Sequence, residues 1–267
     1  MKFKTLSIVA LATLLVSTSS YGFDKDHPVL KFSKSQGPYS ELFISGVQPI
    51  LEKEGYKGEG IDMSDLLQAD LALNDGEVDF NVEQHTAYAK NFNASQDGHL
   101  VTLTPIPTVP AGIYPGSKTA LDSVADGDVI AIPNDASNTA RAYNILAKIG
   151  WIELDKSVDP SKVTKEDIVK NPKNLEFVEM KSLNIPAVAS DFAFVVITGS
   201  VVYNAKIDPS TVLAQEDVAE HLLLQLVVHE KNKDAIWAQD IKKAYQSAEF
   251  KEYLDKNNNG LWFVPKY

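Results

Sequence analysis

The sequence predicts an α/β fold with a mostly parallel sheet. Short runs of β-branched and aromatic residues alternate with helical segments along most of the chain, an order that places helices between parallel strands. The helical segments show apolar residues at helical spacing and end at glycines. Two of the strands run into polar loops that turn at once into helices, and open α/β sheets bind ligands at such ends.

The first predicted elements fill the N-terminal part of the chain. Residues 29–32 predict a strand, and the helix that follows ends near Gly55. Ser64 is expected to cap the next helix, which Gly76 ends, and residues 78–82 predict another strand. The apolar side of the first helix consists of Leu42, Phe43, Val47, Ile50 and Leu51, and that of the second of Leu66, Leu67, Leu71 and Leu73.

The second half of the chain continues the pattern. Residues 129–132 predict a buried strand, which leads through a polar loop into a helix that ends at Gly150. Ser137 or Asn138 is expected to cap that helix. The remaining predicted elements are strands at residues 175–180 and 192–197 and an amphipathic helix at 234–247, whose buried face carries Ile236, Trp237, Ile241 and Tyr245.

The first 22 residues have the pattern of a cleaved secretory signal. Lys2 and Lys4 precede an apolar run that is too short to span a bilayer, and small residues follow it. Phe23 is then the expected first residue of the exported chain. The alternative is a membrane anchor or a buried helix. We expect a periplasmic protein without a direct membrane anchor.

Composition limits the partners of the exported chain. Without the two signal lysines, 23 basic residues face 36 acidic ones, a net charge of −13. This balance argues against nucleic acid or an anionic membrane surface as a partner. A zwitterion or a ligand with a cationic portion is repelled less than an anion. The sequence contains no cysteine, which leaves no disulfide, no thiolate catalysis and no lipid-modified N-terminal cysteine.

Arg141 is the single arginine among 25 basic residues, and it follows the polar loop at residues 133–138. Arginine provides a planar fork that is always charged and suits carboxylate or phosphate. Asn138 stands three residues earlier, and free backbone N–H groups at the helix start would assist an anion there. The alternative is a structural ion pair or a surface arginine.

His85 and Tyr88 mark a second polar site, just after the strand at residues 78–82. Their spacing of three places them on one face of the helix that begins there. Both polar sites therefore lie where a strand turns into a helix.

Three ordered motifs carry a family resemblance. They are Asp79-Phe80-Asn81 with Gln84-His85 and Tyr88, Pro133-Asn134-Asp135 with Ser137-Asn138 and Arg141, and Asn171-Pro172-Lys173-Asn174-Leu175 with Val178-Glu179. Together they resemble the methionine-binding lipoproteins, the substrate-binding proteins of methionine ABC importers, over roughly residues 29–251. The resemblance implies a periplasmic-binding-protein fold of type II, with two lobes that are each a mostly parallel sheet flanked by helices.

The same resemblance implies the domain boundaries and the site. Residues 23–108 and 200–267 would form one lobe and residues 109–199 the other, with crossings near Thr108 and Thr198. Arg141 would hold the ligand carboxylate with Asn138 beside it, while His85 and Tyr88 would line the cleft.

Three positions depart from the family pattern. Glu83 stands where family members carry an aromatic residue, Leu66 replaces a tyrosine, and Thr198 replaces an asparagine. A buried carboxylate requires a cation or a proton, so we expect a more polar or cationic amino acid, or a dipeptide, in place of methionine. Alternatively, Glu83 points into solvent or pairs with a lysine such as Lys90.

Other functions remain as alternatives. A zinc or nickel uptake protein would use Glu83 and His85, with His99, His221 and His229 elsewhere, but the spacing supplies only one pair of ligands. A secreted hydrolase would need a Gly-x-Ser-x-Gly elbow, which is absent, or one of the acidic pairs Asp65/Asp70 and Glu77/Asp79.

We therefore expect an exported, monomeric solute-binding protein that is not an enzyme and needs no cofactor or metal. It would capture a small ligand that bears a carboxylate, an amino acid or a short peptide, and deliver it to an ABC importer permease. Binding would close the lobes on the ligand.

Overall fold

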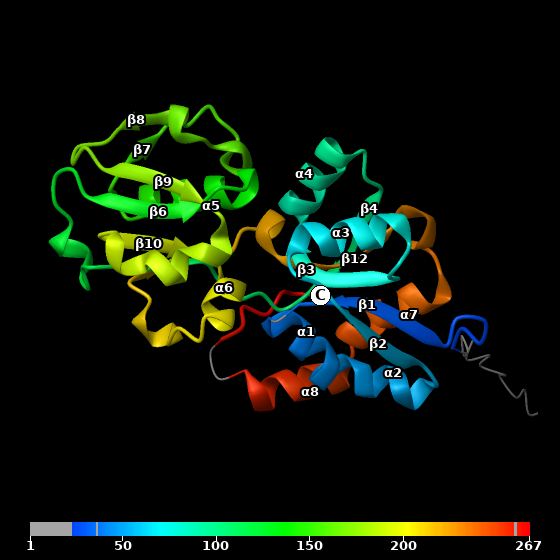
Figure 1. Cartoon of the computed structure of the whole chain (residues 1–267). Helices are drawn as coiled ribbons and strands as arrows, with labels where there is room; N and C mark the ends of the chain where they lie inside the picture. The colour runs from blue at the N-terminus through cyan, green and yellow to red at the C-terminus, as the bar shows by residue number, and fades with distance from the viewer. Residues whose placement is uncertain (1–22, 36, 259–260) are drawn as a thin grey trace, which may run out of the picture.

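The computed structural model describes residues 23–35, 37–258 and 261–267. The expected signal at residues 1–22 lies outside the described residues. The chain forms two lobes, each with a five-stranded sheet and flanking helices (Figure 1). The expected two-lobed α/β fold is confirmed.

The first lobe contains the sheet β2-β1-β3-β12-β4. Its strands are β1 (Val29–Lys34), β2 (Lys57–Asp62), β3 (Phe80–His85), β4 (Leu100–Pro105) and β12 (Leu224–His229). Its helices are α1 (Pro38–Leu42), the π-helical turn η1 (Phe43–Val47), α2 (Gln48–Glu54), α3 (Leu66–Asp75), α4 (Thr86–Gln96), α7 (Ile236–Tyr245) and α8 (Ala248–Asn257).

The second lobe contains the sheet β11-β5-β10-β6-β9. Its strands are β5 (Gly112–Pro115), β6 (Val129–Pro133), β9 (Glu176–Met180), β10 (Phe194–Ile197) and β11 (Ala214–Gln215), with a separate pair β7 (Glu153–Leu154) and β8 (Ile168–Lys170). Its α-helices are α5 (Ala136–Lys148) and α6 (Gly199–Asn204). Its 3-10 segments are η2 (Leu121–Ser123), η3 (Pro160–Lys162), η4 (Lys165–Asp167), η5 (Ser182–Asp191) and η6 (Pro209–Thr211). Two further 3-10 segments lie outside this lobe, η7 (Glu220–Leu222) before β12 and η8 (Glu230–Asn232) after it.

Both main sheets are mostly parallel, as expected, because in each of them four strands run in one direction and one strand runs against them. β1 is parallel to β2 and β3, whereas β12 is antiparallel to β3 and β4. In the second sheet β6 is parallel to β9 and β10, whereas β5 is antiparallel to β10 and β11. The reversed strand of each sheet, β12 or β5, is the first strand of the main sheet after the chain crosses from the other lobe. A chain that crosses over enters the sheet from the opposite end, so this strand runs against the others.

The expected lobe boundary at residue 200 is wrong. Val201 and Val202 of α6 pack with Tyr114 and Ile197 of the second lobe, and β11 pairs with β5 there. Apolar burial and strand pairing thus keep the chain in the second lobe as far as Gln215. It returns to the first lobe through residues 216–223, and not near Thr198.

Two predicted helix caps lie elsewhere. Asp65, not Ser64, caps α3 and accepts a hydrogen bond from the Gln68 N–H at 3.0 Å. Asp135, not Ser137 or Asn138, caps α5. Asp65 directly follows the predicted cap and Asp135 precedes the two predicted caps, and each aspartate accepts the orphan N–H three residues on.

The remaining differences are local. The predicted helix before Gly55 is divided, because Pro49 in the first turn of α2 follows the π-helical turn η1. The polar sequence of the edge strand β2 does not predict a strand. Ile236, expected to be buried, is 43% exposed, although Trp237 and Tyr245 pack in the core of the first lobe as expected.

Candidate functional site

All six predicted site residues line one small cavity between the lobes, of about 50 Å³. The first lobe contributes Tyr39, Leu66, Glu83, Gln84, His85, Tyr88 and Leu224, and the second contributes Asn138, Arg141, Thr198, Gly199 and Ser200. The cavity lies where β3 and β6 turn into helices, the position predicted from the sequence.

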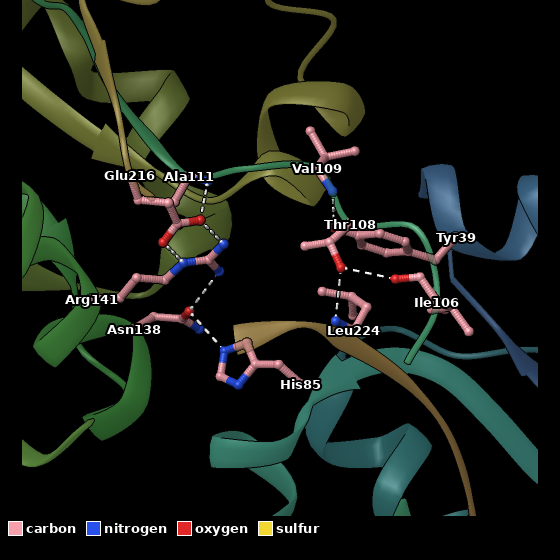
Figure 2. Close-up of polar contacts among 10 residues, drawn as sticks. All are labelled: Tyr39, His85, Ile106, Thr108, Val109, Ala111, Asn138, Arg141, Glu216 and Leu224. Carbon is pink, nitrogen blue, oxygen red and sulfur yellow. Dashed lines mark hydrogen bonds and ion pairs between the residues drawn. The ribbon is translucent and has the colours of Figure 1, made fainter. Parts of the chain in front are cut away.

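Asp135 orients Asn138 at the start of α5. The Asp135 carboxylate accepts the backbone N–H of Asn138 at 3.1 Å and its side-chain N–H groups at 3.0 and 3.1 Å. The Asn138 amide oxygen is therefore free to face the cleft. It accepts from Nη1 of Arg141 at 3.5 Å and lies 3.3 Å from the ring of His85 (Figure 2).

His85 is a neutral hydrogen-bond donor in the cavity. Its Nδ1 accepts the N–H of Tyr88 at 3.1 Å and so caps α4, which leaves the proton on Nε2 to be donated to Asn138. Burial and then the charge of Arg141 lower the pKa of His85 to about 3. The ring therefore carries no charge near neutral pH.

Arg141 is paired with Glu216, a residue that the sequence did not single out. Nε and Nη2 of the guanidinium donate to the two carboxylate oxygens of Glu216 (Figure 2). Both side chains are about 5% exposed or less. The alternative of a structural ion pair is thus realised on one edge of the guanidinium. Nη1 points the other way, toward Asn138.

Glu83 is held inside the first lobe. Its Oε1 accepts the N–H of Ser35 and the hydroxyl of Ser40, both at 2.7 Å. Its Oε2 is buried and has no hydrogen-bond partner among the described residues. Burial raises the pKa of this carboxyl. The alternative in which Glu83 points into solvent or pairs with Lys90 is therefore wrong.

A second carboxyl lies behind the same wall. Asp70 accepts from the side-chain amides of Asn81, at 2.8 Å, and Gln84. Burial raises the pKa of Asp70 to about 7. Gln84, which is not among the predicted site residues, lines the cavity, and its side-chain oxygen is buried without a partner in the described part of the chain. The first-lobe wall is therefore rich in acceptors.

The crossings between the lobes lie beside the cavity. The backbone N–H of Leu224 donates to the Thr108 hydroxyl at 2.8 Å, and that of Val109 donates to the Tyr39 hydroxyl at 3.2 Å (Figure 2). Contacts between the lobes further out join Lys181 to Asp65 and Tyr203 to Glu41. The lobes are thus in contact around the site.

The alternative functions gain no support from the geometry. Within the described ranges, no three histidine or acidic side chains lie close enough together to hold a metal ion. Asp65 caps α3, and Asp79 accepts the N–H of Lys31 at 2.7 Å and pairs with His27, so these acids serve the fold. No helix in the described part is long and apolar enough to cross a membrane.

Comparison with known proteins agrees with the family resemblance of the three sequence motifs. The sequence model of the family described as NlpA lipoprotein matches residues 30–265. The D-methionine-binding lipoprotein MetQ of Salmonella typhi is 29% identical over 263 residues, which span 97% of each chain. The family resemblance of the three motifs is confirmed.

Solved structures match over both lobes. A nutrient binding protein from Burkholderia cenocepacia bound to methionine has a TM-score of 0.82 at 30% identity, over 89% of this chain and 100% of the other. A periplasmic substrate-binding protein of an ABC transporter from Coxiella burnetii has a TM-score of 0.81 at 26% identity, over 88% and 100%.

Proposed function

Because the chain belongs to the NlpA lipoprotein family, we propose that it is the binding protein of an ABC importer and captures an amino acid or a short peptide by its carboxylate. Its relatives are named as binding proteins, and the chain is likewise a binding component and not an enzyme. The ligand and the role of each site residue are our proposal.

The observation that carries the proposal is the position of Arg141. The residue lines the cavity between the lobes, and its Nη1 lies on the side of Asn138 and His85, away from Glu216 (Figure 2). A guanidinium offers five N–H donors in a fixed plane, so an arginine whose Nε/Nη2 edge is paired can still bind a carboxylate through its Nη1/Nη2 edge. Asn138 and His85 add further polar groups beside that edge.

The charges around the cavity favour a ligand that also carries a positive group. The charge of Arg141 is balanced by Glu216, and His85 is neutral. Glu83 adds a buried carboxyl with one unpartnered oxygen. A ligand with only a carboxylate would increase the uncompensated negative charge in a buried site, which is costly. An α-ammonium or a basic side chain would supply the donor that Glu83 lacks.

Lobe closure completes the binding mode. His85, Tyr88 and Glu83 belong to the first lobe, and Asn138, Arg141 and Thr198 belong to the second. A ligand that contacts both sets of residues binds the closed arrangement better than an open one, and so shifts the population toward closure. The closed form would then dock on the importer permease.

We also propose that the protein is free in the periplasm. The named relatives are lipoproteins or periplasmic proteins, and the sequence has no cysteine to which a lipid could be attached.

Native mass spectrometry of protein purified from its own host tests the proposed function. We expect a co-purified mass that matches an amino acid or short peptide, and that is lost on partial unfolding and dialysis. Calorimetric titration of the stripped protein with L-methionine, D-methionine, L-lysine, L-arginine and dipeptides of these residues then identifies the class. Failure of every carboxylate-bearing probe to bind would remove the proposal.

A further inference from the structure

Glu216 lies at the junction of three parts of the molecule. It follows β11 and begins the segment of residues 216–223 that returns to the first lobe. Its backbone N–H donates to the carbonyl of Ala111 at 3.1 Å, and its side-chain Oε1 accepts the N–H of Ala111 at 2.7 Å (Figure 2). Ala111 belongs to the outgoing crossing. One carboxylate therefore joins both crossings to Arg141 on α5.

We propose that Glu216 is the positioning residue of the binding site. It fixes the Nε/Nη2 edge of Arg141, so that the Nη1/Nη2 edge is presented to the ligand carboxylate. The inference rests on the proposed function, in which Arg141 binds that carboxylate, and it adds that the ligand binds beside Glu216 and does not displace it.

The geometry of the guanidinium supports binding of Glu216 at one edge and of the ligand carboxylate at the other. Glu216 uses both of its oxygens on a single edge of the fork, and this bidentate arrangement fixes the plane of the group. An arginine side chain has many rotamers in water, and a ligand that had to select one of them would bind more weakly. Because Glu216 holds the Arg141 rotamer in the folded protein, the conformational entropy of this side chain is lost during folding and not during ligand binding.

Burial makes the pair persistent. Arg141 and Glu216 have side-chain exposures of 4% and 5%, so either charge alone would remain in a poorly hydrated site. The additional bond from Ala111 to Oε1 prevents the carboxylate from following a rotating guanidinium. The orientation of Arg141 is consequently defined relative to the two crossings, which are the segments that must bend when the lobes open and close.

The single arginine of the chain allows a direct spectroscopic test. Protein labelled with 15N-arginine gives one Nε–H signal, because Arg141 is the sole arginine in the sequence. In the wild-type protein we expect this signal to be protected from exchange with water. Addition of the most tightly bound amino acid of the titration panel should leave Nε–H protected and slow the exchange of the Nη protons.

Variants separate positioning from folding. We expect Glu216→Gln to lower the affinity for that probe at least tenfold and to speed the exchange of Nε–H, and Glu216→Ala to do so further. Asp217→Asn is the matched control, since Asp217 is the next residue, pairs with Lys148 and is 89% exposed. Asp217→Asn should change neither the affinity for the probe nor the exchange rate of the Nε–H. A thermal midpoint measured for each variant accounts for any loss of stability.

Three results would overturn the inference. Wild-type affinity in Glu216→Gln would show that Glu216 does not position Arg141. Loss of Nε–H protection when the probe is added to the wild-type protein would show that the ligand displaces Glu216, and this readout holds even if the variants fold poorly. Unchanged affinity in Arg141→Ala would instead remove the proposed function, and the positioning role with it.

Discussion

His85 and Asn138 meet across the gap between the lobes, with Nε2 of the histidine 3.3 Å from the amide oxygen of the asparagine. His85 ends β3 and caps α4 in the first lobe, and Asn138 lies in the first turn of α5 in the second. The contact therefore exists only when the lobes are close together. It also places a titratable ring beside Arg141, where a second positive charge is unfavourable.

Stability should fall in mild acid because of His85. Its pKa of about 3 in the folded protein lies below the value of 6.5 for an unperturbed histidine. The unfolded chain thus binds a proton that the folded chain does not bind, so this contribution is present above pH 6.5 and is lost as pH falls toward 3. We expect the thermal midpoint of His85→Asn, which keeps a helix-capping side chain, to fall less between pH 7 and pH 4 than that of the wild type. The exposed His99→Asn is the control, and equal pH dependence in both variants would contradict the prediction.

Asp70 should act in the opposite direction. Its pKa is raised from 3.8 to about 7 by burial, so its contribution to stability is present below pH 3.8 and is lost as pH rises through 7. Asp70→Asn should therefore flatten the stability profile between pH 5 and pH 8, and chemical denaturation at several pH values measures it. Asp75→Asn, at the exposed end of the same helix, provides the comparison. A profile for Asp70→Asn as steep as that of the wild type would mean that Asp70 titrates normally.

Site residues could be predicted from the sequence where they directly follow a strand that the sequence itself predicts. His85 and Asn138 follow predicted buried strands, and parallel strands place such positions at one edge of a sheet. Apolar periodicity and glycines located those strands and helices to within a few residues. Confirmed elements such as β6 and α5 needed no long-range information.

The features that the sequence does not predict depend on contacts between segments that are distant in the chain. Glu216 lies 75 residues from Arg141 and in an irregular segment, so no local pattern marks it. The partners of Glu83 are 43 and 48 residues away. β2 is an exposed edge strand whose polar sequence carries no alternation, and its strand form depends on pairing with β1. The direction of β12 likewise follows from where the chain returns to the first lobe.

Export should remove the signal and add no lipid. Intact-mass analysis of the periplasmic fraction is expected to give a chain that begins near Phe23, with the mass of the unmodified polypeptide. The sequence has no cysteine to accept a lipid thioether. Recovery of the full-length chain, or of a lipid adduct, would count against this expectation.

Replacement of Arg141 should affect both binding and stability. Loss of the fork leaves a ligand carboxylate without its charged partner, which costs about 2 to 5 kcal/mol, or roughly thirtyfold to several thousandfold in affinity. The same change leaves Glu216 buried and unpaired, so the thermal midpoint of Arg141→Ala should also fall.

Arg141→Lys should recover the charge and part of the stability, but little of the affinity, because an ammonium cannot bind both carboxylates in one plane. Calorimetry and thermal denaturation of the two variants provide the paired measurement. A large drop in midpoint with wild-type affinity would identify Arg141 as purely structural.

Glu83 should determine which amino acid is bound. Its unpartnered Oε2 requires a donor, so the wild-type protein should bind L-lysine or L-arginine, or a dipeptide that contains one of them, more tightly than L-methionine.

Three variants test this role of Glu83. Glu83→Gln removes the charge but retains an acceptor for Ser35 and Ser40. It should weaken binding of the cationic probe by about 2 to 5 kcal/mol and leave binding of methionine nearly unchanged. Glu83→Phe introduces the aromatic side chain that the family resemblance implies at this position, and it should shift the preference toward methionine. Lys90→Ala, on the exposed side of α4, is the matched control. Tight and selective binding of methionine by the wild type would show that Glu83 serves the fold through its two serine partners and does not select the ligand.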